Sequence, residues 1–200
     1  MIDTMRSFIC LPLQHDLARR VESWIGELRR VAPRIRWVAG DQLHVTLKFL
    51  GEVSFVTVAE LARHLQRGLA RTPLVAPELV LGPPGAFPHL RDPRTLWLGI
   101  KDKLEGARRV AELVETAAEA AGLPREGRPF LPHVTLGRGR TGEDFPVALL
   151  DALARSPVTG SPWVASQMLI MKSDLSPQGP RYEIMGEFPL RPSCRSDSPL

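Results

Sequence analysis

Residues 44–47 and residues 133–136 both read HVTL, within QLHVTLKFLG (42–51) and FLPHVTLGRG (130–139). Each copy lies in an apolar stretch that is typical of a β-strand. Successive side chains on a strand alternate between its two faces, so the histidine and threonine of each copy share one face. The valine and leucine share the other face and are expected to anchor the strand in a core.

Apolar periodicity predicts strands and helices on both sides of each copy. The expected elements are a strand at 7–13, a helix over 17–28 ending near Pro33, strands at 35–39 and 42–51 joined by a hairpin turn at Gly40–Asp41, a helix capped by Ser54, strands at 78–82 and 95–100 separated by the Pro- and Gly-rich loop 83–94, a helix capped by Asp102, the strand of the second copy, a short helix over 147–153, and two closing strands at 166–175 and 181–190.

This order of elements, with its many hairpin signals, predicts an α+β fold rather than a purely parallel sheet. The two halves of the sequence resemble each other in outline, and each holds one HVTL strand, which indicates an internal duplication. We expect a single bilobal domain over residues 1–190, with two mainly antiparallel sheets flanked by helices around a central cleft that carries both motifs. The Ser- and Pro-rich segment 191–200 is expected to be a flexible tail.

The formal net charge of +4 favours polyanionic partners. The N-terminus has neither a signal peptide nor a membrane span, so we expect a cytoplasmic protein with no membrane contact. Cys10 and Cys194 fit neither a disulfide framework nor a zinc site, and nothing in the sequence indicates a dimer, so we expect a monomer. No G-x-x-x-x-G-K-[ST] loop is present for nucleoside triphosphates.

Two facing histidines can act as an acid and base pair, because an imidazole pKa near 6.5 lets one accept a proton while the other donates one. If the two halves pack about a pseudo-two-fold axis, His44 and His133 meet across the cleft, and Thr46 and Thr135 offer hydroxyl donors to phosphate oxygens on the same faces. Two cations are expected to bind substrate: Arg138, and Lys48 on the His44 face. This set of side chains fits in-line displacement at phosphorus without a metal or other cofactor.

With these motifs the chain resembles the 2H phosphoesterase superfamily, whose signature is a pair of His-x-Thr-x motifs, and within it the RNA 2',3'-cyclic phosphodiesterases, also called 2'-5' RNA ligases. The resemblance covers nearly the whole chain apart from the tail. It is carried by LHVTLKFLGEV (43–53), FPHLRDPRTLWLGI (87–100), FLPHVTLGR (130–138) and KSDLSPQGPRYE (172–183).

The resemblance implies metal-independent hydrolysis of 2',3'-cyclic phosphate at RNA ends, transfer RNA fragments among them, to 2'-phosphomonoesters. It assigns His44 as proton donor to the 3'-oxygen and His133 as the base that activates water, which the residues alone leave open. It also implies reverse 2'-5' ligation by the same pair. Gly137 stands where the family pattern leads us to expect alanine, and we expect it to keep the cleft free of a side chain.

Two other functions remain open at this point. One is a phosphodiesterase of the same superfamily that acts on a small cyclic nucleotide or a 2'-5' oligonucleotide. The other is a non-catalytic module that binds RNA ends. The remaining histidines, His15, His64 and His89, are interpreted as solvated or structural, and Trp97 as a core residue. Four aromatic residues either pack in the core or stack on a base: Phe49, Phe87, Phe130 and Tyr182.

Overall fold

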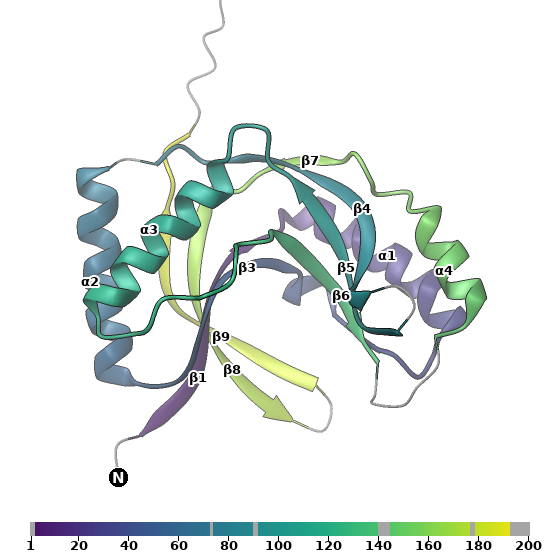
Figure 1. The fold of residues 1–200 in the computed structure, drawn as a ribbon, viewed down its shortest axis with the longest axis horizontal. Helices are drawn as coiled ribbons and strands as arrows, with labels where there is room; N and C mark the ends of the chain where they lie inside the picture. Colours follow the sequence, from purple (N-terminus) through teal and green to yellow (C-terminus); the bar gives the residue numbers. More distant parts are fainter. Residues whose placement is uncertain (1–2, 73, 90–91, 140–144, 177–178, 193–200) are drawn as a thin grey trace, which may run out of the picture.

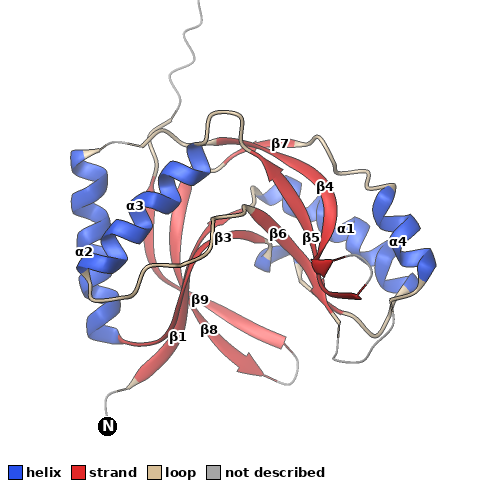
Figure 2. Ribbon diagram, in the orientation of Figure 1, coloured by secondary structure: helices blue, strands red, loops and turns tan. Residues whose placement is uncertain are grey.

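The computed structural model describes residues 3–72, 74–89, 92–139, 145–176 and 179–192 as a curled antiparallel sheet with helices packed against it (Figures 1 and 2). The predicted α+β class is confirmed. In chain order the elements are β1 (Thr4–Pro12), α1 (His15–Val31), β2 (Arg36–Trp37), the 3₁₀ helix η1 (Gly40–Gln42), β3 (His44–Ser54), α2 (Phe55–Arg71), β4 (Glu78–His89), β5 (Asp92–Lys101), α3 (Gly106–Ala120), β6 (His133–Arg138), α4 (Val147–Ala154), β7 (Pro162–Val164), β8 (Gln167–Ser176) and β9 (Gly179–Pro189).

The strands form one nine-stranded sheet in the order β7-β4-β5-β6-β3-β1-β8-β9, with β2 paired to β6 outside this path. Its two centre strands, β3 and β6, meet in a single antiparallel pair, Val45 opposite Val134. The two predicted sheets are therefore the two halves of one sheet. We call them the β3 half (β3, β1, β8 and β9) and the β6 half (β6, β5, β4 and β7, with β2).

The helices cover the two halves in an exchanged arrangement (Figure 1). α2 and α3 pack against each other and against β3, whereas α1 packs against α4, which contacts β4. Arg20 of α1 donates a hydrogen bond to Ser161 Oγ, next to β7, at 3.0 Å. The helix that follows β1 thus covers the β6 half, and the helix that follows β5 covers the β3 half.

Amphipathic patterns and caps explain where the helices form. α1 buries Leu17, Val21, Trp24, Ile25 and Leu28 along one face, at the spacing of a helix. At the start of α2, Ser54 Oγ accepts a hydrogen bond from the Thr57 amide at 3.1 Å, as predicted for a cap. The carboxylate of Asp102 likewise accepts the amides of Gly106 and Ala107 at the start of α3, at 2.9 and 2.8 Å.

The predicted hairpin at Gly40–Asp41 is wrong, because residues 40–42 form the 3₁₀ helix η1 and β2 does not pair with β3. Instead β2 pairs with β6, with Trp37 opposite Gly137. The amide of Val38 extends this contact by donating to the carbonyl of Leu136 at 2.8 Å. The segment that leads into the first motif is therefore held against the strand of the second motif.

Arg191, the first residue of the predicted tail, is bonded to the rest of the domain. The Arg191 amide donates to the carbonyl of Leu74 at 3.0 Å, and the Arg191 carbonyl accepts from Ala76 at 2.7 Å, so this residue belongs to the folded domain. Of the predicted tail, residues 193–200 lie outside the described residues.

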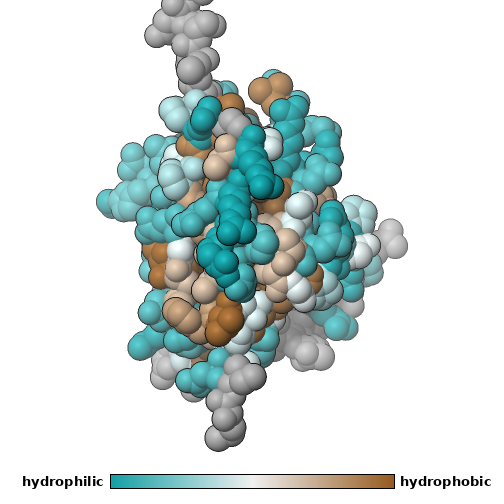
Figure 3. Space-filling view, turned by 90° about the vertical axis from the view of Figure 1, so that its left-hand side faces the viewer, coloured by the Kyte–Doolittle hydropathy of each residue, from teal (hydrophilic) through white to brown (hydrophobic). Residues whose placement is uncertain are grey.

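The side of the molecule that carries α2 and α3 is mainly hydrophilic, with small apolar patches (Figure 3). Among the described residues, none of the helices combines the length and apolar character needed to span a membrane.

Candidate active site

The two HVTL motifs are neighbours in the sheet. Val45 and Val134, the central residues of the β3–β6 contact, are both completely buried on the helix-covered side. Extending this antiparallel register by one residue in each direction places His44 across from Thr135, and Thr46 across from His133. All four polar side chains are half-buried and lie on the opposite face of the sheet, which we call the motif face. A local two-fold axis between the valines relates the two motifs.

Both motifs contain a β-bulge at their leucine. In the β1–β3 pairing, Cys10 faces Thr46 and Ile9 faces Lys48, so Leu47 has no partner. In the β5–β6 pairing, Trp97 faces Thr135 and Leu96 faces Gly137, so Leu136 has none. An extra residue of this kind shifts the alternation of side chains by one position.

The shift decides which residues after each motif reach the motif face. Lys48 and Gly137 turn to the helix-covered side, and Lys48 is only 7% exposed. The next residues, Phe49 and Arg138, turn to the motif face: the ring of Phe49 lies 6.3 Å from that of Phe8, and the Arg138 charge acts on both motif histidines.

The predicted place of Lys48 is therefore wrong. Its ammonium donates to both carboxylate oxygens of Glu115 and to the carbonyl of Pro124, each at 2.9 Å, away from the motif face. The expectation for Gly137 also fails, because a Cβ there would meet Ile35 Cγ2 at 2.9 Å and Trp37 Cε3 at 3.0 Å rather than project into a cleft.

The two motif histidines have the same orientation. His44 Nδ1 lies 2.6 Å from the carbonyl oxygen of Gln42, and His133 Nδ1 lies 2.8 Å from that of Leu131. A carbonyl oxygen only accepts, so each Nδ1 carries the hydrogen. In the neutral imidazole, Nε2 is then the free acceptor, and it is the nitrogen that can exchange protons with a substrate.

His44 lies in an aromatic environment. Its ring stacks on Phe8 with centroids 4.8 Å apart and meets Tyr182 edge-on at 5.7 Å. Burial lowers the pKa of His44 to about 4, an effect that the Gln42 carbonyl opposes and the charges of His133 and Arg138 reinforce. The imidazole of His44 is therefore neutral at pH 7.

His133 has a matching but more open environment. Its ring meets Phe87 edge-on at 5.1 Å and lies 6.1 Å from Trp97. Burial lowers the pKa of His133, the Leu131 carbonyl raises it, and the Arg138 charge lowers it further. Trp97, predicted as a core residue, is half-buried beside His133 on the motif face.

Sequence reasoning missed the aromatic support of His44. Phe8 was assigned no role from the sequence. The signal was its place on β1 two residues before Cys10, which puts it on the same face as Cys10 and the paired Thr46. Tyr182 lies on β9, and its position beside His44 depends on the non-local pairing of β8 with β1. In the part of the chain that the structure describes, no three His, Cys, Asp or Glu side chains are grouped so that they could hold a metal ion.

Comparisons with known proteins identify the family of the chain. A model of the 2'-5' RNA ligase superfamily matches residues 17–174. An RNA 2',3'-cyclic phosphodiesterase of Aeropyrum pernix is 32% identical over 86% of this chain and 99% of the relative, and one of Thermotoga maritima is 27% identical over 92% and 94%. The crystal structure of Escherichia coli LigT in its apo form covers 94% of this chain and 99% of its own, with a TM-score of 0.74 and 25% identity.

Proposed function

Because the chain belongs to the 2'-5' RNA ligase superfamily, we propose that it hydrolyses 2',3'-cyclic phosphate at RNA ends to a 2'-phosphomonoester. The observation that carries the proposal is the pair of imidazoles on adjacent strands, each with Nδ1 bound to a backbone carbonyl, which leaves Nε2 as the proton acceptor of the neutral ring. The names of the relatives from Aeropyrum pernix and Thermotoga maritima support the same substrate.

The proposed reaction is an in-line displacement that uses both histidines. His133 Nε2 takes a proton from water while the water oxygen bonds to phosphorus. The bond from phosphorus to the 3'-oxygen breaks, and protonated His44 gives its Nε2 proton to that oxygen. The products are a 2'-phosphate and a 3'-hydroxyl, with His44 neutral and His133 protonated until they exchange protons with solvent.

The more open surroundings of His133 suit the role of base, because attacking water must reach its Nε2. Thr46 and Thr135 lie on the same face and would donate hydroxyl hydrogen bonds to the non-bridging oxygens. Arg138 would stabilise the negative charge that builds up on those oxygens. This distribution gives Arg138 and the four polar side chains of the two motifs a task in the reaction.

Because the pKa of His44 is low in the free protein, His44 must take up its proton when the substrate binds. Burial keeps the free imidazole neutral at pH 7, whereas the acid step needs it charged. A bound phosphate anion beside the ring favours the protonated form and raises the pKa. We therefore expect one proton to be taken up when a phosphodiester substrate or a phosphate analogue binds.

The same pair of histidines can serve ligation. If a 5'-hydroxyl replaces water, His133 takes the hydroxyl proton while its oxygen bonds to phosphorus, the bond from phosphorus to the 3'-oxygen breaks, His44 protonates that oxygen, and the product is a 2'-5' linkage. Water at high concentration favours hydrolysis. We propose ligation as a secondary activity of the same site, without ATP.

The test is an assay of one panel of substrates with the purified protein. The panel holds an RNA oligonucleotide ending in a 2',3'-cyclic phosphate, a 2',3'-cyclic mononucleotide and a 2'-5' oligonucleotide. Phosphorus NMR identifies each product, and a 2'-phosphate formed fastest from the RNA end is the expected result. Preference for either small substrate would change the substrate class, and binding of cyclic-phosphate RNA without any product over hours would indicate a binding module instead.

A further inference from the structure

Lys48 and Glu115 form a nearly buried ion pair between β3 and α3. Their side chains are 5% and 16% exposed. An ammonium group has three hydrogens to donate, and Lys48 uses them on the two carboxylate oxygens of Glu115 and the carbonyl of Pro124. Because these three acceptors take all three hydrogens, the ammonium group of Lys48 is not available to a substrate.

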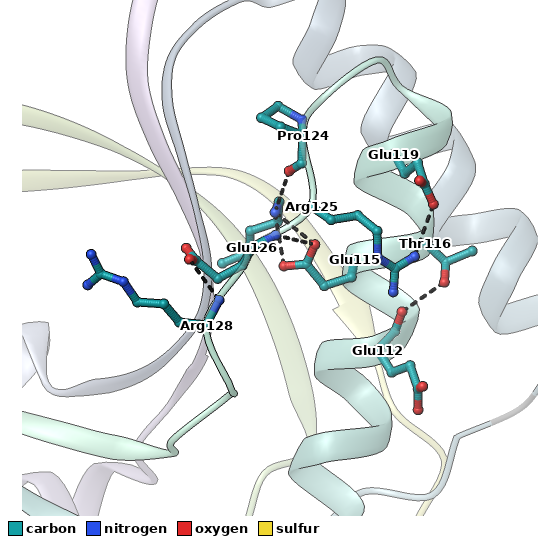
Figure 4. Close-up of polar contacts among 9 residues, drawn as sticks. Glu112, Glu115, Thr116, Glu119, Pro124, Arg125, Glu126 and Arg128 are labelled. Atoms are coloured by element: carbon teal, nitrogen blue, oxygen red, sulfur yellow. Dashed lines mark hydrogen bonds and ion pairs between the residues drawn. The ribbon is translucent and has the colours of Figure 1, made fainter.

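The same carboxylate also holds the backbone of the segment between α3 and β6, residues 121–132, which we call the lead-in of His133. Glu115 accepts the amide of Glu126 at 3.2 Å, and Figure 4 shows this contact beside the Pro124 carbonyl. The ion pair thus fixes the lead-in at two points. Five residues beyond the second point, the Leu131 carbonyl binds Nδ1 of His133.

The first motif shows what such a lead-in requires. The segment before His44 is held against β6 by backbone pairing, with Trp37 opposite Gly137 and Val38 bonded to Leu136. Gly137 and Lys48 occupy equivalent positions after the two bulges. In the β6 half, the pairing of β2 beside Gly137 holds the segment before His44. In the β3 half, the side chains of Lys48 and Glu115 hold the segment before His133.

We propose that Lys48 and Glu115 are positioning residues for His133: they hold the lead-in so that the Leu131 carbonyl keeps the hydrogen on Nδ1 and Nε2 faces the substrate. The kinetic part of this proposal rests on the proposed function, and the part that concerns the ring does not. Contacts of the pair with two backbone groups of the lead-in, the Pro124 carbonyl and the Glu126 amide, offset part of the cost of removing the charges from water.

The test uses Lys48→Met and the double variant Lys48→Met/Glu115→Gln, which removes the remaining charge. Lys48→Arg is the conservative variant, since a guanidinium can still bind the carboxylate. Arg125→Met is the matched control: it removes the Arg125–Glu119 ion pair of the same lead-in, whose side chains are 50% and 58% exposed. Circular dichroism verifies that each variant is folded.

Two measurements follow on the full-length protein. In ¹⁵N-histidine NMR spectra, assigned with a His133→Asn variant, we expect the share of the Nδ1–H form to fall for His133 in both Met variants and to stay constant for His44. With RNA that ends in a cyclic phosphate, we expect kcat to fall roughly 10- to 100-fold, as for a misplaced catalytic group, and KM to change less than about 3-fold. Lys48→Arg should keep most of the Nδ1–H form of His133 and most of kcat. Arg125→Met should change neither quantity.

Three results would overturn the proposal. The first is a wild-type His133 tautomer in both Met variants. The second is an equal change at His44 and His133, which would mean general loosening of the sheet. The third is a rise in KM at constant kcat, which would mean that Lys48 binds substrate. If the wild-type protein leaves every cyclic phosphate intact, the proposed function fails, and the NMR result alone decides the positioning role.

Discussion

Val45 and Val134 are the only residue pair through which β3 and β6 are joined in the described sheet, and both side chains are completely buried. This contact fixes the register of the two strands that carry His44 and His133, and the pairing of β2 with β6 holds the segment before His44 beside it. The spacing of the two imidazoles therefore depends on apolar packing on the far side of the sheet.

Alanine at either motif histidine tests the acid and base roles. We expect His44→Ala or His133→Ala to reduce hydrolysis of a 2',3'-cyclic phosphate by roughly 100-fold or more, because each removes one proton-transfer group. His15→Ala, in an exposed residue at the start of α1, should retain wild-type activity. EDTA should leave the wild-type rate unchanged. A loss of activity in EDTA that a divalent ion restores would contradict the two-histidine mechanism.

The buried imidazole of His44 predicts a specific loss of stability in acid. At pH 7 the ring is neutral in the folded and the unfolded chain, so it costs nothing. Between an unfolded-state pKa of about 6.5 and the folded-state pKa of about 4, the unfolded chain binds a proton that the folded chain does not. The free energy of unfolding therefore decreases as the pH is lowered through this range. From about pH 7 to about pH 4.5 this group should remove about 2 to 3 kcal/mol.

Urea unfolding of the wild type and of His44→Gln at those two pH values measures the effect. The variant lacks the titrating group, so it should lose less stability than the wild type by about the same 2 to 3 kcal/mol. Equal losses in the two proteins would mean that His44 is as easily protonated in the fold as in the unfolded chain.

Arg138 is predicted to act on both imidazoles at once. Its charge lowers the pKa of His44 and of His133, so Arg138→Gln should raise both values, as followed by NMR titration of the imidazole protons. We expect kcat/KM to fall by roughly 100-fold, as when a donor to a developing charge is removed. Arg138→Lys should keep the two pKa values near those of the wild type and recover only part of the rate, since it retains the charge without the planar fork. Activity and titrations that both match the wild type in Arg138→Gln would place this side chain outside the site.

Gly137 is predicted to be needed for packing between β2 and β6. A methyl group there would lie 2.9 Å from Ile35 Cγ2 and 3.2 Å from the carbonyl of Arg36, so Gly137→Ala should force the strands apart. We expect a loss of about 1 to 3 kcal/mol in the free energy of unfolding, measured in urea. Gly127→Ala is the control, because its added carbon would meet no atom within 4 Å apart from those of its own residue and its two chain neighbours. A variant as stable as the wild type would show that β2 moves without cost.

The local features of the fold could be predicted from the sequence because each depends on residues near one another in the chain. The buried face of α1 follows from its apolar spacing, and Ser54 and Asp102 cap the helices that they precede. The pairing of β2 with β6 joins residues about a hundred positions apart, so a local turn signal at Gly40–Asp41 predicted the wrong neighbour. The Pro-rich segment predicted as a loop is mostly strand, since β4 accommodates Pro84 and Pro88 where its register shifts.

The site was predictable up to the bulges. Alternation places His44 with Thr46 and His133 with Thr135, as found. Regular alternation along the strand would put Lys48 on the same face as His44, but the bulge at Leu47 turns Lys48 to the opposite face. The same alternation puts Arg138 on the side away from His133, and the bulge at Leu136 reverses that too. A single unpaired residue leaves no mark in the composition or periodicity of the sequence, so the reversal appears only once the pairing is known.

The exchange of α1 and α3 between the two halves of the sheet limits how this duplicated chain can be divided. A cut between α2 and β4 would leave an N-terminal fragment with β1 and β3 but without the α3 that covers them, and a C-terminal fragment with β4 and β5 but without α1. Each fragment would expose an apolar surface that only the other can cover. The repeat is therefore interlocked, and its two copies are expected to fold as a single cooperative unit rather than as autonomous modules.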